Sequence, residues 1–314
     1  MKAYYSTAYG GPDVSHLGNL PDPVPDNKQV LVEVKAVSLN PVDFKAKRGD
    51  LKFLTGSKFP KIFGSDFSGI IKDSGKADPD FKPGDRVYGV AAVIFGKQGA
   101  LSQFLAVDRK NVWPIPIQMT FEEAASLPIG ALTAMNGLNR TGVTEGTHLL
   151  INGGTGGVGH FATQIAKARG AVVTVTCSEA NAGFAKSLGA DTTMEYSQEA
   201  FASYSRKFDA IFDAYGHMDL KDAMRMLNKG GIYASTMLNP FVLVSSLFIR
   251  IITSKKLTSA NLSSKPSDRE ELERLFMEKK LHPVIENMYT LDTAAEAFEF
   301  AEKGKPRGKI IVRI

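Results

Sequence analysis

The chain has 314 residues, with 43% hydrophobic and 23% charged residues and a formal net charge of +5. This length allows about two domains, and the composition is typical of a globular enzyme with a substantial core. Basic residues are spread along the chain, which argues against a nucleic-acid-binding tail. The single cysteine, Cys177, excludes an intramolecular disulfide and a dithiol metal motif.

The N-terminal stretch MKAYYSTAYG is strand-like and lacks the long apolar segment of a secretory signal. The most apolar stretch, Phe241–Ile252, is too short to span a bilayer and contains Arg250. We expect it to form a buried or interface helix. The sequence therefore predicts a cytoplasmic protein without a membrane span, and nucleic acid is not expected among its partners.

About the first 120 residues consist of short β-branched runs separated by glycine and proline. QVLVEVKAVSLN alternates as a half-buried strand does, and FKPGDRVYGV places a Pro-Gly-Asp turn before another strand. This part predicts an irregular, mostly β domain. Thr120 and Glu123 then form a capping box, which predicts a helical stretch continuing through ALTAMNGL.

From about His148 onward, predicted strands and helices alternate. The expected strands are HLLIN, AVVTVTC, TTMEY, FDAIFDAYG and IYASTM, and the expected helices are VGHFATQIAKARG, NAGFAKSLGA and LKDAMRMLNKGG, the last with a glycine stop. Such alternation predicts a parallel, doubly wound sheet with right-handed crossovers. A helix is expected from Ser267, and the closing KIIVRI is a strand that returns to the first domain.

The stretch INGGTGGVGH places five glycines between a predicted strand and a predicted helix. Its spacing is Gly154-x-Gly156-x-x-Gly159. In such motifs the first glycine makes a tight turn, the second leaves room for a pyrophosphate, and the third lets the helix pack on the strand. Backbone N–H groups at the helix start make an anion site. Because the strand, turn and helix have the expected order, we interpret this as a dinucleotide site rather than a merely structural turn. The residues expected to bind the cofactor here are Gly153, Gly154, Thr155, Gly156, Gly157, Val158 and Gly159.

The end of the next predicted strand indicates which dinucleotide is bound. An NAD site places an acidic residue there, about 20 residues on, but this chain has Ser178 nineteen residues after Gly159. A hydroxyl can donate to a 2′-phosphate, which a carboxylate would repel. Asn181 and Tyr196 are expected to assist, as is Lys186. Glu179 argues the other way, but we favour NADPH (NADP).

Several motifs spread over almost the whole chain carry a family resemblance: VSLNPVDFKAKRG, FPKIFGSDFSG, FKPGDRVYG, AASLPIGALTA, INGGTGGVGHFATQIAKARGA, SLGAD and RGKIIV. In this order they resemble the zinc-free medium-chain dehydrogenases/reductases, namely the quinone oxidoreductase group that includes zeta-crystallin. The SLNPVDFK form is most similar to the chloroplast-envelope quinone oxidoreductase-like branch. The resemblance implies a GroES-like catalytic domain at residues 1–121 and 267–314, a Rossmann domain at residues 122–266, and a homodimer.

Zinc-dependent members of this family need cysteine and histidine ligands in the first domain. The corresponding stretches here contain Asn40 instead of a cysteine and Ser65 instead of a histidine. The four-cysteine structural loop is also missing, and the five histidines are scattered. We therefore expect no metal site. Without a Lewis acid, the expected reaction is hydride transfer to a quinone or to an α,β-unsaturated carbonyl compound, where conjugation absorbs the developing charge.

The resemblance also implies roles for individual residues. Asn40 and Lys45 correspond to positions beside the nicotinamide and its ribose, and Thr133 matches a threonine on the nicotinamide side. Asn40 is expected to donate to the substrate carbonyl. Lys309 is expected either to reach the cofactor or to be a solvated lysine of the tail. Tyr215 is expected to be core or to wall the nicotinamide, with core slightly favoured.

Two carboxylates and several aromatic residues complete the set of candidates. Asp43 and Asp66 are expected to cap backbone N–H groups near turns. Phe53, Phe95 and the run Phe241–Phe248 are candidates for the lining of a substrate cleft between the two domains, although a single aromatic residue is more often part of the core. Two alternative functions stay open at this point. One is a zinc-dependent alcohol dehydrogenase, and the other is a non-catalytic NADPH-binding protein with a structural or RNA-binding role.

Overall fold

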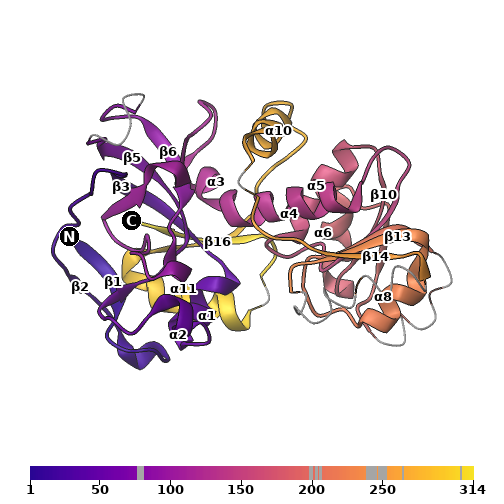
Figure 1. Ribbon diagram of the computed structural model, residues 1–314, viewed down its shortest axis with the longest axis horizontal. Helices are drawn as coiled ribbons and strands as arrows, with labels where there is room; N and C mark the ends of the chain where they lie inside the picture. Colours follow the sequence, from indigo (N-terminus) through magenta and orange to yellow (C-terminus); the bar gives the residue numbers. More distant parts are fainter. Residues whose placement is uncertain are drawn as a thin grey trace. The chain divides into compact units, whose positions relative to one another are not determined.

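The structure is a computed structural model that describes the chain except residues 76–80, 198–200, 202–203, 205–206, 238–245, 247–252, 264 and 305. It divides into two compact units, Met1–Ile129 with Ile285–Ile314, and Gly130–Val284 (Figure 1). Among the described residues, no helix is both long and apolar enough to cross a membrane. Apart from Ser246, the apolar stretch Phe241–Ile252 lies outside the described residues, so the helix expected there stays a prediction.

The first unit is built on two sheets. A three-stranded sheet has the order β2-β1-β4, and a seven-stranded sheet has the order β15-β16-β3-β5-β6-β8 with β7 also paired to β3. The strands are β1 (Lys2–Ser6), β2 (Ser15–Asn19), β3 (Gln29–Leu39), β4 (Lys61–Ile62), β5 (Asp66–Asp73), β6 (Arg86–Val90), β7 (Phe104–Asp108), β8 (Val112–Pro114), β15 (Ile285–Thr290) and β16 (Lys309–Arg313). The helices are α1 (Pro41–Arg48), α2 (Lys52–Thr55), α3 (Phe121–Ser126) and α11 (Ala294–Lys303), with the 3-10 turns η1 (Pro12–Val14), η2 (Val93–Phe95), η3 (Arg109–Asn111) and η5 (Leu291–Thr293).

Several local predictions for this unit are confirmed. β3 alternates half-buried and buried residues before it becomes fully buried at its end. The Pro-Gly-Asp turn precedes β6, where Asp85 N donates to Lys82 O at 3.0 Å. The closing strand β16 pairs antiparallel with β3, which returns the C-terminal segment to the first unit.

The capping box before α3 is also present. Thr120 Oγ1 accepts a hydrogen bond from Glu123 N at 3.2 Å, and the Glu123 carboxylate accepts from Thr120 N at 2.8 Å. These two bonds satisfy donors that the first turn of a helix otherwise leaves unpaired. The short helix α3 packs on β3 and β5 and therefore belongs to the first unit.

The second unit is a six-stranded parallel sheet in the order β11-β10-β9-β12-β13-β14. The strands are β9 (His148–Asn152), β10 (Val172–Thr176), β11 (Thr192–Met194), β12 (Phe208–Asp213), β13 (Leu227–Ser235) and β14 (Lys256–Ser259). The helices are α4 (Pro128–Thr141, which begins in the first unit), α5 (Gly159–Ala168), α6 (Ala182–Ser187), α8 (Leu220–Met226) and α10 (Pro266–Met277), with the 3-10 turn η4 (Glu179–Asn181). Figure 1 shows α5 and α8 on the sheet, where α5 contacts β9 and β10 and α8 contacts β13.

The strand order confirms the predicted doubly wound parallel sheet. The chain runs outward from β9 through β10 to β11, then resumes on the other side of β9 with β12. The order therefore reverses between β9 and β12. In open α/β sheets, ligands bind beyond the carboxyl ends of the strands at such a switch point.

Two features differ from the sequence-based expectations. The helix expected to end at a glycine stop ends earlier, at Met226, because Leu227 is extended and pairs with Phe208 in β13. The unit boundaries fall at Ile129/Gly130 and Val284/Ile285 instead of 121/122 and 266/267. Helix α10 belongs to the second unit because Asp268 and Glu271 bind partners of that unit.

Candidate functional site

The glycine turn joins β9 to α5 at the switch point. Gly153 has a left-handed φ of +74°, a conformation that suits glycine. A Cβ on Gly159 would lie 2.0 Å from Gly153 O, so α5 starts in direct contact with the turn. A Cβ on Gly156 would meet nothing closer than 3.6 Å, which leaves its outer side open. The turn thus has the close packing at one glycine and the open approach at another that a pyrophosphate requires.

The other residues expected to bind the cofactor follow neighbouring strands at the same edge of the sheet. Ser178 lies two residues beyond β10 and is half-buried, and Asn181 ends the turn η4 that follows it. Tyr196 lies two residues beyond β11 and its side chain is exposed. Carboxyl ends of parallel strands lie together, so the structure brings these three residues to the edge that carries the glycine turn. Thr133 lies in α4 and is buried.

A polar network that sequence analysis missed lies at this edge. Four strands end in polar residues whose side chains are buried: Asn152 on β9, Thr176 on β10, Asp213 on β12 and Ser235 on β13. Asn152 Nδ2 donates to Asp213 Oδ1 at 2.7 Å, across the switch point. The sequence contains a signal that could have predicted this network, because each of these polar residues directly follows a strongly apolar stretch.

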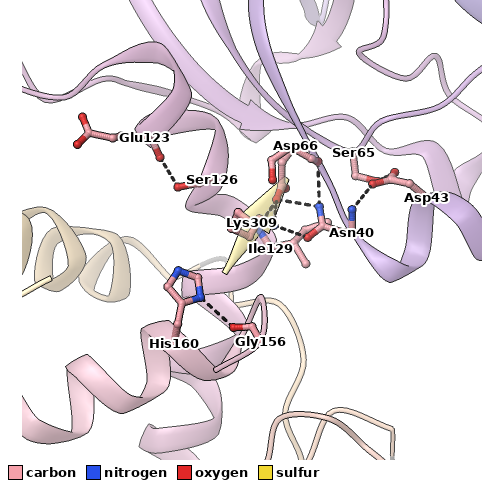
Figure 2. Close-up of polar contacts among 11 residues, drawn as sticks. Asn40, Asp43, Ser65, Asp66, Glu123, Ser126, Ile129, Gly156, His160 and Lys309 are labelled. Atoms are coloured by element: carbon pink, nitrogen blue, oxygen red, sulfur yellow. Dashed lines mark hydrogen bonds and ion pairs between the residues drawn. The ribbon is translucent and has the colours of Figure 1, made fainter. Parts of the chain in front are cut away.

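A second buried network lies in the first unit, where β3 ends and α1 begins (Figure 2). Lys309 Nζ on β16 donates to Asn40 Oδ1 at 2.6 Å and lies 3.5 Å from Asp66 Oδ2 on β5. Asn40 Nδ2 donates to Asp66 Oδ2 at 2.9 Å and to Ser38 O at 3.3 Å. The structure therefore brings together Asn40 and Lys309, which are 269 positions apart in the sequence.

Both aspartates of this region cap backbone groups, as expected. Asn40 N donates to Asp43 Oδ2 at 2.8 Å at the start of α1. Ile129 N donates to both oxygens of Asp66, at 3.1 and 3.2 Å, at the start of α4. Ser65 Oγ adds a hydrogen bond to Asp43 Oδ1 at 2.5 Å. The Ser65 hydroxyl therefore supports the Asp43 side chain that caps α1.

Burial dominates the electrostatics of this cluster. It raises the pKa of Asp43 to about 6 and the pKa of Asp66 to about 7, against the lowering influence of hydrogen bonds and of the Lys309 ammonium. Burial also lowers the pKa of Lys309, and both carboxylates oppose that shift. The cluster thus holds two carboxyl groups and one amine whose charged forms depend on one another.

These contacts correct two of the sequence-based expectations. Lys309 is 3% exposed, so it is not a solvated lysine of the tail. Both N–H bonds of the Asn40 side chain already point to protein acceptors, which disfavours the expected direct donation to a substrate carbonyl. Lys45 lies further along α1 and is half-buried.

Exposed apolar side chains gather near α1 in the same unit. Phe53 on α2 and Phe95 on η2 are 79% and 68% exposed, and η2 packs against both α1 and α2. Tyr215, for which a core position was slightly favoured, is 63% exposed beyond β12, so that expectation was wrong. The Tyr215 ring makes an edge contact with His217, with centroids 4.9 Å apart.

The described residues contain no group of three or more His, Cys, Asp or Glu side chains arranged to hold a metal ion. His160 is buried at the start of α5, with Nδ1 2.9 Å from Gly156 O (Figure 2). The other four histidines, His16, His148, His217 and His282, are exposed. Cys177 is buried, and burial raises the pKa of its thiol, which is typical of a packing residue.

A parallel sheet with a glycine turn at its switch point, in a chain that also forms a separate mostly β unit, is typical of the two-domain oxidoreductases that bind a dinucleotide. Two family profiles match the chain: "Alcohol dehydrogenase GroES-like domain" over residues 26–117 and "Zinc-binding dehydrogenase" over residues 188–312. The chain belongs to the medium-chain dehydrogenase/reductase family.

Individual relatives lie in the expected part of this family. The chain is 31% identical to a chloroplast envelope quinone oxidoreductase homolog of Arabidopsis thaliana, over 99% of this chain and 98% of the relative. It is 33% identical to the NADPH-dependent alkenal/one oxidoreductase, chloroplastic, of the same plant, over 99% of this chain and 79% of the relative. The solved quinone oxidoreductase from Coxiella burnetii is 29% identical with a TM-score of 0.90, covering 100% of this chain and 99% of that one.

Proposed function

We propose that this protein is an NADPH-dependent, zinc-independent oxidoreductase that reduces a quinone or an α,β-unsaturated carbonyl compound. The observation that carries the proposal is the buried Asn40–Asp66–Lys309 cluster. By the family resemblance, Asn40 stands at a position where zinc-dependent members have a cysteine ligand. When bound, NADPH supplies a hydride, and conjugated acceptors take it up without a Lewis acid. The quinone oxidoreductase and alkenal/one oxidoreductase names of the relatives support this substrate class.

The charge of the cluster supports zinc independence. Lys309 places an amine 2.6 Å from Asn40 Oδ1 and 3.5 Å from Asp66 Oδ2. In the charged form of the pair, the Lys309 ammonium balances the Asp66 carboxylate, and a divalent cation beside that ammonium would be repelled. Asn40 and Ser65 also lack the thiol and imidazole groups that zinc prefers.

The preference for NADPH rests on the residues that follow β10 and β11. Ser178 and Asn181 offer a hydroxyl and an amide near the place where an NAD-specific site has a carboxylate. Tyr196 is exposed at the next strand end and can approach a ribose phosphate from that side. We therefore propose that these three residues bind the 2′-phosphate and that the residues of the glycine turn bind the pyrophosphate.

The substrate is proposed to bind in the first unit beside α1. Phe53 and Phe95 give that surface an apolar character, which suits a quinone ring or an alkenal chain. Asn40 is proposed to hold the Lys309 amine in place through its oxygen, and Lys45 is proposed to contact the cofactor ribose or the developing enolate. Thr133 is proposed to lie on the nicotinamide side of the cofactor.

A parallel substrate panel tests this function. NADPH and NADH oxidation are followed with a 1,4-benzoquinone and with a 2-alkenal, on protein whose zinc content has been measured and after treatment with a chelator. We expect NADPH oxidation with at least one of the two acceptors, and no loss of activity on chelation. Stoichiometric zinc that activity requires would support the alcohol dehydrogenase alternative instead.

Dinucleotide binding without turnover of either acceptor would reject the reductase proposal. If salt-sensitive RNA binding accompanied that result, the non-catalytic alternative would take its place. The homodimer and the cytoplasmic location remain predictions, and the oligomeric state is measured directly by light scattering on the same sample.

A further inference from the structure

The side chain of Asp213 is unusual because it is a fully buried carboxylate whose hydrogen-bond donors are all neutral. It is 0% exposed at the carboxyl end of β12. Its oxygens accept from the Asn152 amide at 2.7 Å, the Tyr233 hydroxyl at 2.9 Å and the Ser235 hydroxyl at 3.3 Å. Two backbone groups, Gly216 N at 2.8 Å and Met218 N at 3.0 Å, complete the set. Burying a carboxylate is costly unless it is well hydrogen-bonded, so five donors gathered around one buried carboxylate suggest a role for it.

A chain of hydrogen bonds leads from this carboxylate to the glycine turn. Asn152 donates to Asp213 through Nδ2, and its Oδ1 accepts from Thr176 Oγ1 at 2.6 Å. Thr176 Oγ1 in turn accepts from Gly153 N at 2.9 Å. Gly153 is the turn residue with φ +74°, and its carbonyl oxygen accepts from Gly156 N at 3.1 Å.

The carboxylate of Asp213, as an acceptor, sets the direction of every bond in this chain. A carboxylate only accepts, so Asn152 must present its NH₂ group to Asp213 and therefore its oxygen to Thr176. The Thr176 hydroxyl then donates to Asn152, which leaves its oxygen free to accept from Gly153 N–H. A neutral side chain at position 213 would remove this constraint, because the Asn152 amide could then turn over.

Asp213 also holds the segment on the other side of the turn. Its bonds to Gly216 N and Met218 N fix the loop that follows β12 and presents Tyr215. Tyr215 N donates to Asn152 O at 3.2 Å, and a Cβ on Gly153 would lie 2.9 Å from Tyr215 Cβ. The loop and the glycine turn therefore pack directly on each other.

We propose that Asp213 is a positioning residue for the dinucleotide: through Asn152 and Thr176 it sets the conformation of Gly153, and through its loop contacts it holds Tyr215 beside the turn. This inference rests on the proposed nicotinamide dinucleotide site. It assigns to Asp213 no contact with the cofactor or the reacting atoms. The expected effect is on dinucleotide affinity rather than on the reaction of the other substrate.

The test compares three variants by direct NADPH titration, with turnover measured separately. Asp213→Asn keeps the size of the side chain but must turn an NH₂ group toward either the two donors of one carboxylate oxygen or the three donors of the other. Thr176→Val breaks the chain to Gly153 without touching Asp213. Asp209→Asn is the matched control, because Asp209 lies on the same strand β12 and accepts from His148 N and Asn228 Nδ2 at the opposite end of that strand.

We expect Asp213→Asn and Thr176→Val each to raise the NADPH Kd by about tenfold, the effect of one lost buried hydrogen bond. The quinone or alkenal KM at saturating NADPH should change less than about twofold, and Asp209→Asn should leave the NADPH Kd unchanged. A purely structural role for Asp213 would lower the melting temperature and the active fraction without changing the Kd of the folded protein, and this result would overturn the proposal.

The Thr176→Val variant keeps the proposal testable if Asp213→Asn does not fold, since an unchanged Kd in that variant also overturns it. The failure of the proposed function is a separate result. A wild-type protein that binds NADPH but reduces neither acceptor would reject the reductase and leave the positioning role in place. Wild-type protein that binds no nicotinamide dinucleotide would reject both.

Discussion

Replacing Lys309 with methionine perturbs the cluster in the first unit most directly. The change keeps a long side chain but removes the amine that donates to Asn40 Oδ1 at 2.6 Å and lies 3.5 Å from Asp66 Oδ2. The substitution removes the nearby cation that favours the charged form of the Asp66 carboxylate. Water cannot take its place, because Asp66 is 0% exposed. We expect the Lys309→Met variant to be less stable, with a loss that depends on pH.

The sign of this pH dependence follows from the direction of the pKa shifts. Burial raises the Asp66 pKa from 3.8 to about 7, so its contribution to stability is complete below about pH 4 and is lost as the pH rises through 7. Burial lowers the Lys309 pKa, so its contribution is present above pH 10.5 and is lost as the pH falls through the folded value. Without the amine, the Asp66 pKa rises further, and the variant therefore becomes less stable relative to wild type as the pH rises from 6 to 8.

The size of the loss follows from the interactions removed. Losing one charged hydrogen bond and one partner of a buried pair costs about 3 kcal/mol at pH 8, where Asp66 must either stay charged without its cation or take up a proton that is scarce at that pH. At pH 6 the aspartate takes up a proton, and we expect about half that loss. Asp66→Asn added to Lys309→Met should recover most of the difference between the two pH values.

Urea unfolding at pH 6 and pH 8 measures these changes in the free energy of unfolding. Lys303→Met is the matched control, since Lys303 forms an exposed ion pair with Glu299 on α11 and should cost less than about 0.5 kcal/mol at either pH. An equal loss at both pH values in Lys309→Met, with no recovery on adding Asp66→Asn, would refute the assignment of a buried ion pair to this cluster.

Two further predictions concern the second unit, and a third concerns the helix cap before α3 in the first unit. Ser178→Asp should lower the ratio of NADPH affinity to NADH affinity by at least about tenfold, because the new carboxylate repels the 2′-phosphate. The control Ser187→Asp, on the exposed surface of α6, should not change this ratio. If titrations with both cofactors showed the same affinity ratio for Ser178→Asp and wild type, Ser178 would not be at the phosphate site. Gly159→Ala places a Cβ 2.0 Å from a backbone oxygen of the turn, so it should weaken NADPH binding and lower the melting temperature. The control Gly183→Ala in α6, where a Cβ would meet nothing within 4 Å, should leave stability unchanged or raise it by up to about 1 kcal/mol. Thr120→Ala removes the helix cap and should cost about 1 kcal/mol in thermal unfolding, and retention of full stability would mean that the capping box contributes nothing.

Local patterns in the sequence were sufficient for much of the fold. The alternation in β3, the turn before β6 and the capping box at Thr120 depend on neighbours within a few residues, and all three are present. The glycine spacing likewise predicted a strand, a turn and a helix in the order observed. The prediction failed where contacts between distant segments determine the secondary structure. Leu227 was expected in a helix, but it is extended because it pairs with Phe208 in the sheet.

The class of the molecule could be predicted from the sequence, because the glycine turn and the alternation of strands and helices depend only on local order and residue chemistry. The environments of Lys309, Tyr215 and Asp213 depend on contacts between distant segments and could not be predicted from local patterns. A lysine near the end of the chain became a buried partner of Asn40 because β16 pairs with β3. Asp213 contacts Asn152 because β12 lies beside β9, and burial strengthens a hydrogen bond that would be weak between solvated side chains.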